Sequence, residues 1–179
     1  MECGKLVFGM SLPACLVEAV RDRSWMSLAS SPRLEAVFGY APVHPRFHAF
    51  SGMVGVTEWW RGLDEEMAPF YGASDDPSAP GHMSRTSTVI IGNLGPDLPF
   101  ALDYRESPAD PSVAFLGEGD HWQRVSGSVS DLILALDPLR AGDAPAGTGA
   151  TGSPADGERR LIEAPDNHRL PGYEQSWTP

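Results

Sequence analysis

Residues 85–137 constrain the fold of this chain more than any other part of its 179 residues. Short apolar runs rich in Val, Ile, Phe and Trp alternate there with clusters of Gly, Pro, Asn and Asp. This alternation is typical of consecutive strands that are joined by tight turns. After Ser128 the apolar residues change to a helical period. We therefore predict a meander of about four strands, closed by one helix that packs back on the sheet.

The first strand of the meander is predicted to begin at about Thr86 and to be central. Its run Thr88–Ile91 is almost continuously apolar, which is typical of a strand that is buried on both faces. Residues 98–103 are predicted as the returning strand, after a turn rich in Gly, Asn and Pro. Pro99 cannot donate a ladder hydrogen bond, so it indicates either a sheet edge or an irregular strand start.

The second half of the meander is predicted to be a hairpin followed by the closing helix. Residues 112–116 and 121–125 read as two strands around the polar loop 117–120. Ser128 is expected to cap the helix, because a serine oxygen can accept a hydrogen bond from a free N–H of the first turn. Asp131, at the third helical position, is expected to support that cap.

Three amphipathic helices are predicted in the first half of the chain. Residues 12–21 form the first, with Ser11 as its cap, because apolar residues recur on one face. Residues 31–38 form the second, and residues from about 53 to 63 form the third. Residues 46–50 alternate between two faces and are predicted as a further strand.

Together these elements predict a single α+β domain over residues 1–140. It would hold a mixed or mainly antiparallel sheet of about four to six strands, flanked by helices. Residues 64–83 are polar, acidic and contain proline, and we expect them to form a surface excursion. From 141 to 179 the chain is rich in Gly, Ala and Pro, which predicts a linker and tail that is disordered or loosely docked.

The charge balance excludes several classes of partner. The net charge is −11, and Lys5 is the single lysine beside twelve arginines. A general nucleic-acid binder needs a basic face, so we expect none of that activity. The longest apolar runs are far too short to span a membrane. The N-terminal apolar run is also too short for a signal peptide, so we expect a cytoplasmic protein with Cys3 and Cys15 reduced.

Sequence patterns of catalytic and metal centres are missing. The chain has no Gly-x-Ser-x-Gly elbow, and Cys15 lies in a predicted amphipathic helix, where a packing role is expected. His44 and His48 are four residues apart, but Pro45 lies between them, which disfavours a shared helical face. The turn 92–95 lacks the Gly-Lys-Ser/Thr ending of a phosphate-binding loop. We therefore predict no enzyme, no cofactor and no metal.

The remaining candidate site is a surface around the third helix. Trp59 and Trp60 point about 100° apart on that helix, so they cannot both face the same spot. Either one is core and one half-exposed, or an aromatic anchor stands beside an acidic run. That run carries a local charge of −5 over residues 58–76 and includes Asp64, Glu65, Glu66, Asp75 and Asp76. It is either a solvated loop or a docking face for a basic protein.

A set of motifs in the second half carries a family resemblance. It comprises a Gly-containing turn, an apolar strand ending in an Asp-Tyr-Arg block, a Pro-x-Val strand, a Trp strand and a closing helix. The corresponding residues are Gly92, Asp103, Tyr104, Arg105, Pro111, Val113, Trp122 and Ser128 to Leu136. With the opening helix, these motifs resemble the SUKH superfamily, the Smi/Knr-like domains of cell-wall assembly regulators, over roughly residues 12–139.

The resemblance implies an α+β fold without catalysis, in which the Asp-Tyr-Arg block and Trp122 are structural. Bacterial members of that superfamily are commonly immunity proteins that neutralise toxins, often nucleases, and fungal relatives regulate wall synthesis through protein contacts. The chain departs from the family by lacking the usual Asn-Gly after the first helix. From the resemblance and the acidic charge we nevertheless expect an immunity-type module that binds a basic toxin domain. A regulatory scaffold and an enzyme of unrecognised type are the alternatives.

Overall fold

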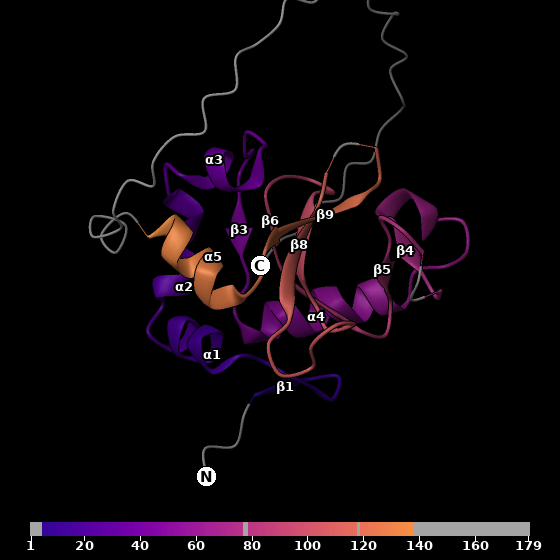
Figure 1. The fold of residues 1–179 in the computed structure, drawn as a ribbon, viewed down its shortest axis with the longest axis horizontal. Coiled ribbons are helices and arrows are strands. Elements are labelled where there is room, and N and C mark those ends of the chain that lie inside the picture. The colour runs from indigo at the N-terminus through magenta and orange to yellow at the C-terminus, as the bar shows by residue number, and fades with distance from the viewer. Residues whose placement is uncertain (1–4, 77–78, 118, 138–179) are drawn as a thin grey trace, which may run out of the picture. The chain divides into compact units, whose positions relative to one another are not determined.

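A five-stranded antiparallel sheet forms the centre of the domain (Figure 1). The computed structural model describes residues 5–76, 79–117 and 119–137. Along the sheet, each strand pairs antiparallel with its neighbour in the order β3-β6-β7-β8-β9. The strands are β3 (Arg46–Phe47), β6 (Thr88–Asn93), β7 (Pro99–Asp103), β8 (Ser112–Leu116) and β9 (Trp122–Ser126). The predicted four-strand meander and the α+β class are confirmed.

Five α-helices and two smaller sheets complete the described part of the chain. The helices are α1 (Ala14–Arg21), α2 (Ser24–Ser27), α3 (Leu34–Phe38), α4 (Phe50–Arg61) and α5 (Val129–Leu136). Two short 3-10 turns are η1 (Leu28–Ser30) and η2 (Pro69–Tyr71). One small sheet pairs β1 (Leu6–Val7) with β2 (Met10–Ser11), and the other pairs β4 (Ala73–Ser74) with β5 (Met83–Ser84). Within the described ranges, each helix is too short or too polar to cross a lipid bilayer.

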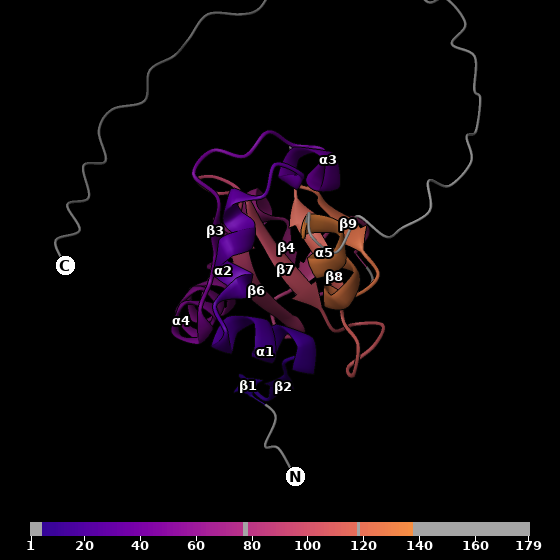
Figure 2. The ribbon, with the colours of Figure 1, turned by 90° about the vertical axis from the view of Figure 1, so that its left-hand side faces the viewer.

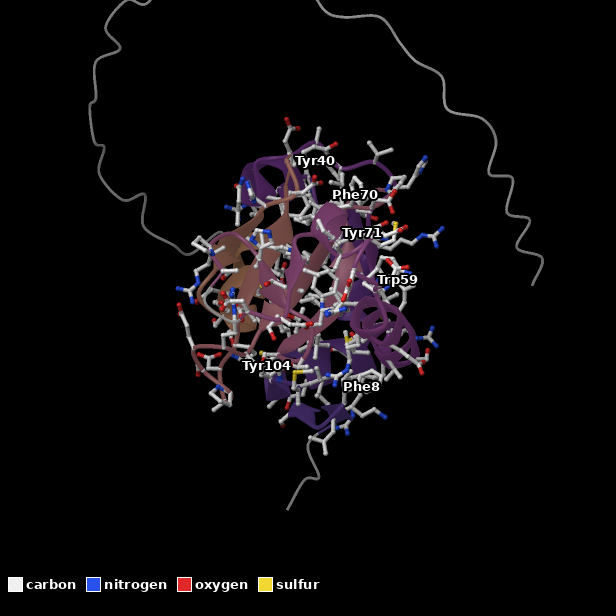
Figure 3. The ribbon with its side chains drawn as sticks, turned by 90° about the vertical axis from the view of Figure 1, so that its right-hand side faces the viewer. Phe8, Tyr40, Trp59, Phe70, Tyr71 and Tyr104 are labelled. Atoms are coloured by element: carbon white, nitrogen blue, oxygen red, sulfur yellow. The ribbon has the colours of Figure 1, made fainter. Side chains whose placement is uncertain are left out.

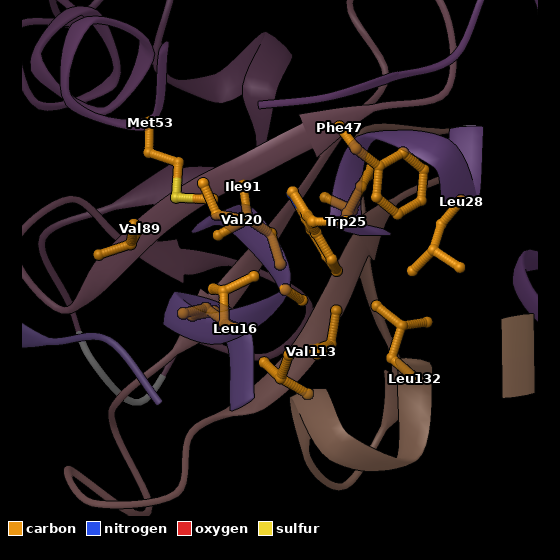
Figure 4. Close-up of a cluster of buried hydrophobic side chains, with 14 of the residues drawn as sticks. Leu16, Val20, Trp25, Leu28, Phe47, Met53, Val89, Ile91, Val113 and Leu132 are labelled. Carbon is orange, nitrogen blue, oxygen red and sulfur yellow. The ribbon is translucent and has the colours of Figure 1, made fainter. Parts of the chain in front are cut away.

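Both faces of the central strands β6, β7 and β8 are buried, which explains why these strands read as almost continuous apolar runs. On one face α1, α2, α3 and α5 cover the alternate residues Val89, Ile91, Leu102 and Val113 (Figures 2 and 4). On the other face Ile90, Ala101 and Ala114 contribute to a second cluster that contains Trp60 and Trp122. Helix α4 contributes to both clusters, since Met53 belongs to the first and Trp60 to the second.

A β-bulge in β6 shapes the contact between the sheet and α4. The register of β6 against β7 shifts between Ile90 and Gly92, so the ladder is interrupted there. The N–H of Ile90 donates instead to the Thr57 hydroxyl oxygen of α4, at 3.0 Å. Thr57 is fully buried. The helix therefore satisfies a backbone group that the bulge would otherwise leave without a partner in the core.

Several predicted boundaries differ from the observed ones. Ser11 was expected to cap the first helix, but it pairs with Leu6 in the β1–β2 hairpin, and Pro13 stands at the N-cap instead. The expected strand 46–50 is shorter, because α4 begins at Phe50. Pro99 opens a central strand with partners on both sides, so the interpretation as a strand start is right and the edge interpretation is wrong.

The surface excursion predicted for residues 64–83 is only half right. Its acidic residues are exposed, but Ala68, Ala73 and Met83 are buried in the second core cluster. The segment is therefore packed against the sheet at three points. In contrast, the predicted cap of α5 is confirmed, since the Ser128 hydroxyl oxygen accepts the Asp131 N–H at 3.1 Å. The predicted linker and tail, residues 141–179, lie outside the described residues.

Candidate functional site

The Asp-Tyr-Arg block at the end of β7 is a structural junction. The Asp103 carboxylate is buried and accepts the Arg105 backbone N–H at 3.1 Å. It also accepts two guanidinium donors of Arg105, from Nε at 2.9 Å and from a terminal nitrogen at 2.8 Å. These hydrogen bonds raise the pKa of Arg105 above its usual range. Asp103 thus fixes the turn of the chain as it leaves the sheet.

Tyr104 and Trp122 connect the same region to other parts of the fold. The Tyr104 hydroxyl donates to the Ser11 carbonyl oxygen at 3.0 Å, and burial raises the pKa of this tyrosine. The Trp122 indole N–H donates to the Tyr71 carbonyl oxygen at 2.8 Å. The Trp122 ring also packs edge-on against Trp60, with ring centroids 5.5 Å apart. Tyr104 and Trp122 therefore each connect two segments of the chain that are distant in sequence.

Replacing Asp103 with asparagine is expected to lower the free energy of unfolding by about 1–3 kcal/mol, because the charge-assisted bonds to Arg105 are lost at a buried position. Urea denaturation would measure the change. Asp110→Asn is the matched control, since Asp110 is exposed on the following loop, and it should change stability by less than about 0.5 kcal/mol. Unchanged stability of Asp103→Asn together with lost partner binding would instead make Asp103 a contact residue.

A shallow cleft of about 260 Å³ lies beside this junction, lined among others by His82, Arg105 and Arg124. Both arginines are engaged in ion pairs, Arg105 with Asp103 and Arg124 with Glu106. Such pairing disfavours the capture of an external anion. No group of three or more His, Cys, Asp or Glu side chains that could hold a metal ion occurs among the described residues.

The two adjacent tryptophans of α4 have different environments. Trp60 is fully buried in the second core cluster, whereas the side chain of Trp59 is 47% exposed. Their burial therefore agrees with the interpretation that one tryptophan belongs to the core and the other is half-exposed. Trp59 stands edge-on against Tyr71, with ring centroids 4.9 Å apart. Burial and a 2.8 Å hydrogen bond to Asp97 raise the pKa of Tyr71 to about 12, so its hydroxyl stays a neutral donor.

Trp59 belongs to a larger exposed apolar surface, which we name the aromatic patch and define as Trp59, Met67, Phe70 and Tyr71. Met67 is 42% exposed and Phe70 is 63% exposed. Figure 3 shows Trp59, Tyr71 and Phe70 along one side of the domain. Reasoning from the sequence missed Met67, Phe70 and Tyr71. The run Met67-Ala-Pro-Phe-Tyr71 directly after the acids contained the pattern that could have identified them.

The acidic run divides into residues with structural partners and residues that face solvent. The Asp64 carboxylate accepts the backbone N–H groups of Glu66 and Met67, at 3.1 and 2.8 Å, and so caps a turn. Asp75 forms an ion pair with Arg85, whose hydrogen bond lowers the pKa of that carboxyl. Arg85 also donates to the Leu63 carbonyl oxygen.

Glu65, Glu66 and Asp76 are the other acidic members of the predicted site, and all three are exposed. Asp76 follows β4, and its backbone N–H donates to the Ser74 hydroxyl oxygen at 3.0 Å. Glu65 and Glu66 lie on the turn that leads directly into Met67. These two glutamates directly precede Met67 of the aromatic patch in the sequence. Asp64 and Asp75, in contrast, have partners within the local fold.

No protein-family model, curated protein or solved structure matches this chain. The fold and the contacts described above are therefore the basis for a functional proposal, together with the motif resemblance of residues 91–136.

Proposed function

We propose that this chain is a non-catalytic protein-binding module of the immunity type, which occludes a basic protein domain such as a nuclease toxin. The observation that carries the proposal is the aromatic patch, with Phe70 63% exposed, beside the acidic turn of Glu65 and Glu66. Exposed aromatic residues of this size are the usual anchors of protein interfaces. The resemblance to the SUKH superfamily supports the same class of function.

The charge of the surface agrees with a basic partner. A nuclease domain carries cations, because its own substrate is a polyanion. The chain has a net charge of −11, and the exposed Glu65 and Glu66 directly precede Met67 of the aromatic patch in the sequence. Apolar anchors with a border of one charge sign give both affinity and fast association with an oppositely charged partner.

The test first looks for a toxin gene beside the gene of this chain. It then measures association with that toxin domain, produced with its active site inactivated. Glu65→Gln combined with Glu66→Gln should lower the association rate roughly two- to tenfold at low salt, because electrostatic steering is reduced. The difference should shrink as salt screens the charges. Asp64 is kept, since its carboxylate holds the turn.

The matched control combines Glu35→Gln with Asp110→Asn. It removes the same number of charges from exposed positions outside the aromatic patch and the acidic run. If both double variants slow association equally, net charge and not this surface governs the encounter. If neither variant changes the rate or its salt dependence, the acidic turn only keeps the loop solvated, and the proposed docking face is wrong. A gene neighbourhood that encodes metabolic enzymes and no toxin would argue against the immunity function itself.

A further inference from the structure

A pair of histidines lies where the segment before β5 meets the start of β9. His82 directly precedes β5, and His121 directly precedes β9. The Trp122 backbone N–H donates to the Gly81 carbonyl oxygen at 2.8 Å, so the two segments are side by side at this point. The two imidazole rings stand edge-on, with their centroids 5.9 Å apart. The fold therefore brings together two histidines that lie far apart in the sequence.

The backbone of Gly81 makes room for the His121 ring. Gly81 has a φ of +71°, a conformation that residues with a side chain rarely adopt. A Cβ atom at this position would stand 3.2 Å from the Nδ1 atom of His121. The ring of His121 thus lies against bare backbone, next to His82, and glycine at position 81 permits this close arrangement.

The backbone also sets the tautomer of His82. Its Nδ1 atom lies 2.9 Å from the Pro80 carbonyl oxygen. A carbonyl oxygen can only accept a hydrogen bond, so Nδ1 carries the proton and Nε2 of the neutral ring carries the lone pair. Histidines that bind metals almost always donate their other ring N–H in this way, to a backbone carbonyl, a carboxylate or water. His82 therefore has the hydrogen bonding of a metal ligand whose donor atom is Nε2.

The spacing of the two rings fits a shared metal ion. Two imidazoles that bind one ion, with metal–nitrogen distances of about 2 Å, have ring centroids roughly 4.5–6 Å apart, depending on the angle at the metal. The observed 5.9 Å lies at the upper end of that range. Because His121 is exposed, a small rotation of its side chain can close the pair without disturbing the core.

The charges around the pair permit a cation. Arg105 and Arg124 line the cleft that also contains His82. Each of these arginines forms an ion pair with a carboxylate of the chain, which offsets its charge. The exposed Asp120 directly precedes His121 and adds a negative charge on the same turn. The net charge of −11 over the whole chain also favours the approach of a cation.

We propose that His82 and His121 together bind one divalent transition-metal ion, such as Ni²⁺ or Zn²⁺, with one ring nitrogen from each histidine. Imidazole nitrogens suit these ions, whereas Mg²⁺ and Ca²⁺ prefer oxygen ligands. The described residues provide no third His, Cys, Asp or Glu side chain for the ion, so water completes its coordination. The bound ion links the segment before β5 to the turn between β8 and β9. The pair includes no residue of the aromatic patch or of the acidic run, so the inference does not rest on the proposed function.

The test titrates the full chain, purified without a histidine tag, with Ni²⁺ in isothermal titration calorimetry. We expect one ion to bind per chain with a dissociation constant in the micromolar range, and Zn²⁺ to compete for the same site. Mg²⁺ should neither bind there nor compete. His82→Asn and His121→Asn should each weaken Ni²⁺ binding at least about tenfold, because each removes one of two protein ligands. Ni²⁺ should also raise the melting temperature of the parent chain, and both variants should lose this rise.

His44→Asn is the matched control, with the same chemical change at a histidine outside the pair. His44 is exposed and has a φ of 56°, which asparagine tolerates, so this variant should keep the Ni²⁺ affinity of the parent chain. His82 and His121 are partly or fully exposed. Their variants should therefore keep the melting temperature of the metal-free parent chain, which circular dichroism verifies.

Three results would overturn the proposal. The first is that the parent chain does not bind Ni²⁺. The second is equal binding by the parent chain and both site variants, because the ion then binds elsewhere. The third is loss of binding in only one of the two site variants, since a single histidine would then hold the ion.

Discussion

Replacing Trp60 with alanine is expected to lower the free energy of unfolding by about 3–5 kcal/mol. The ring is fully buried in the second core cluster, and it packs edge-on against Trp122 at 5.5 Å. Removing it therefore exchanges a large apolar contact area for a cavity between α4 and the sheet. Among the described residues the Trp60 indole N–H has no hydrogen-bond partner, so the expected loss comes from packing. Urea denaturation monitored by circular dichroism measures the effect.

The neighbouring Trp59→Ala substitution is the matched control, with the same chemical change one residue earlier. Its ring is half-exposed and contacts Tyr71 at the surface, so we expect a loss below about 1 kcal/mol. Binding should show the reverse order. Trp59→Ala should weaken capture of a partner at the aromatic patch about tenfold or more. Equal destabilisation by both substitutions would contradict the assignment of one tryptophan to the core and one to the surface.

The sheet and its closing helix could be predicted from the sequence because their determinants are local. The turns between β6 and β7 and between β8 and β9 contain Gly, Pro and Asp at residues 95–97 and 119–120, and these residue types favour turns over regular strands. The cap of α5 depends on Ser128 and Asp131, which stand three residues apart and bond each other directly. A pattern contained within a few residues is visible in the sequence before any tertiary contact is known.

The errors fall where tertiary contacts override local patterns. Ser11 looks like a helix cap, but the β1–β2 hairpin uses its backbone, and its carbonyl oxygen accepts the distant Tyr104 hydroxyl. The polar composition of residues 64–83 hid the burial of Met83, because the residues that anchor it come from other strands. The cation that neutralises Asp75 is Arg85, which lies just beyond the acidic run.

For the candidate site, the acids and Trp59 could be located from the sequence, but their grouping could not. Trp59 belongs to α4, whereas Phe70 and Tyr71 belong to η2. Their proximity depends on the chain reversal between Leu63 and Ala73, where Asp64 bonds two backbone N–H groups. The same reversal leaves Glu65 and Glu66 exposed. A short polar turn therefore positions the segment that carries Phe70 and Tyr71 and also carries two exposed glutamates.

Replacing Gly92 with alanine is expected to lower the free energy of unfolding by about 3 kcal/mol or more. Gly92 lies in β6 beside the bulge and faces its partner Phe100 of β7. A Cβ atom at Gly92 would stand 2.2 Å from the Phe100 ring and 2.6 Å from the Arg46 carbonyl oxygen. Both distances are far inside van der Waals contact, so either the aromatic ring or the β3–β6 pairing must move.

Gly55→Ala provides the control that separates this clash from the general effect of removing a glycine. Gly55 is exposed in α4, and an added Cβ atom would meet nothing within 4 Å. Because alanine favours the helix and restricts the unfolded chain, this substitution should raise stability by about 0.5–1 kcal/mol. The two substitutions make the same chemical change but should shift the free energy of unfolding in opposite directions.

A double variant, Gly92→Ala with Phe100→Leu, should recover only part of the loss, since the Arg46 carbonyl oxygen remains in place. Full recovery would show that the ring alone requires glycine at this position, and no loss in the single variant would contradict the close approach of β3 and β7 at Gly92.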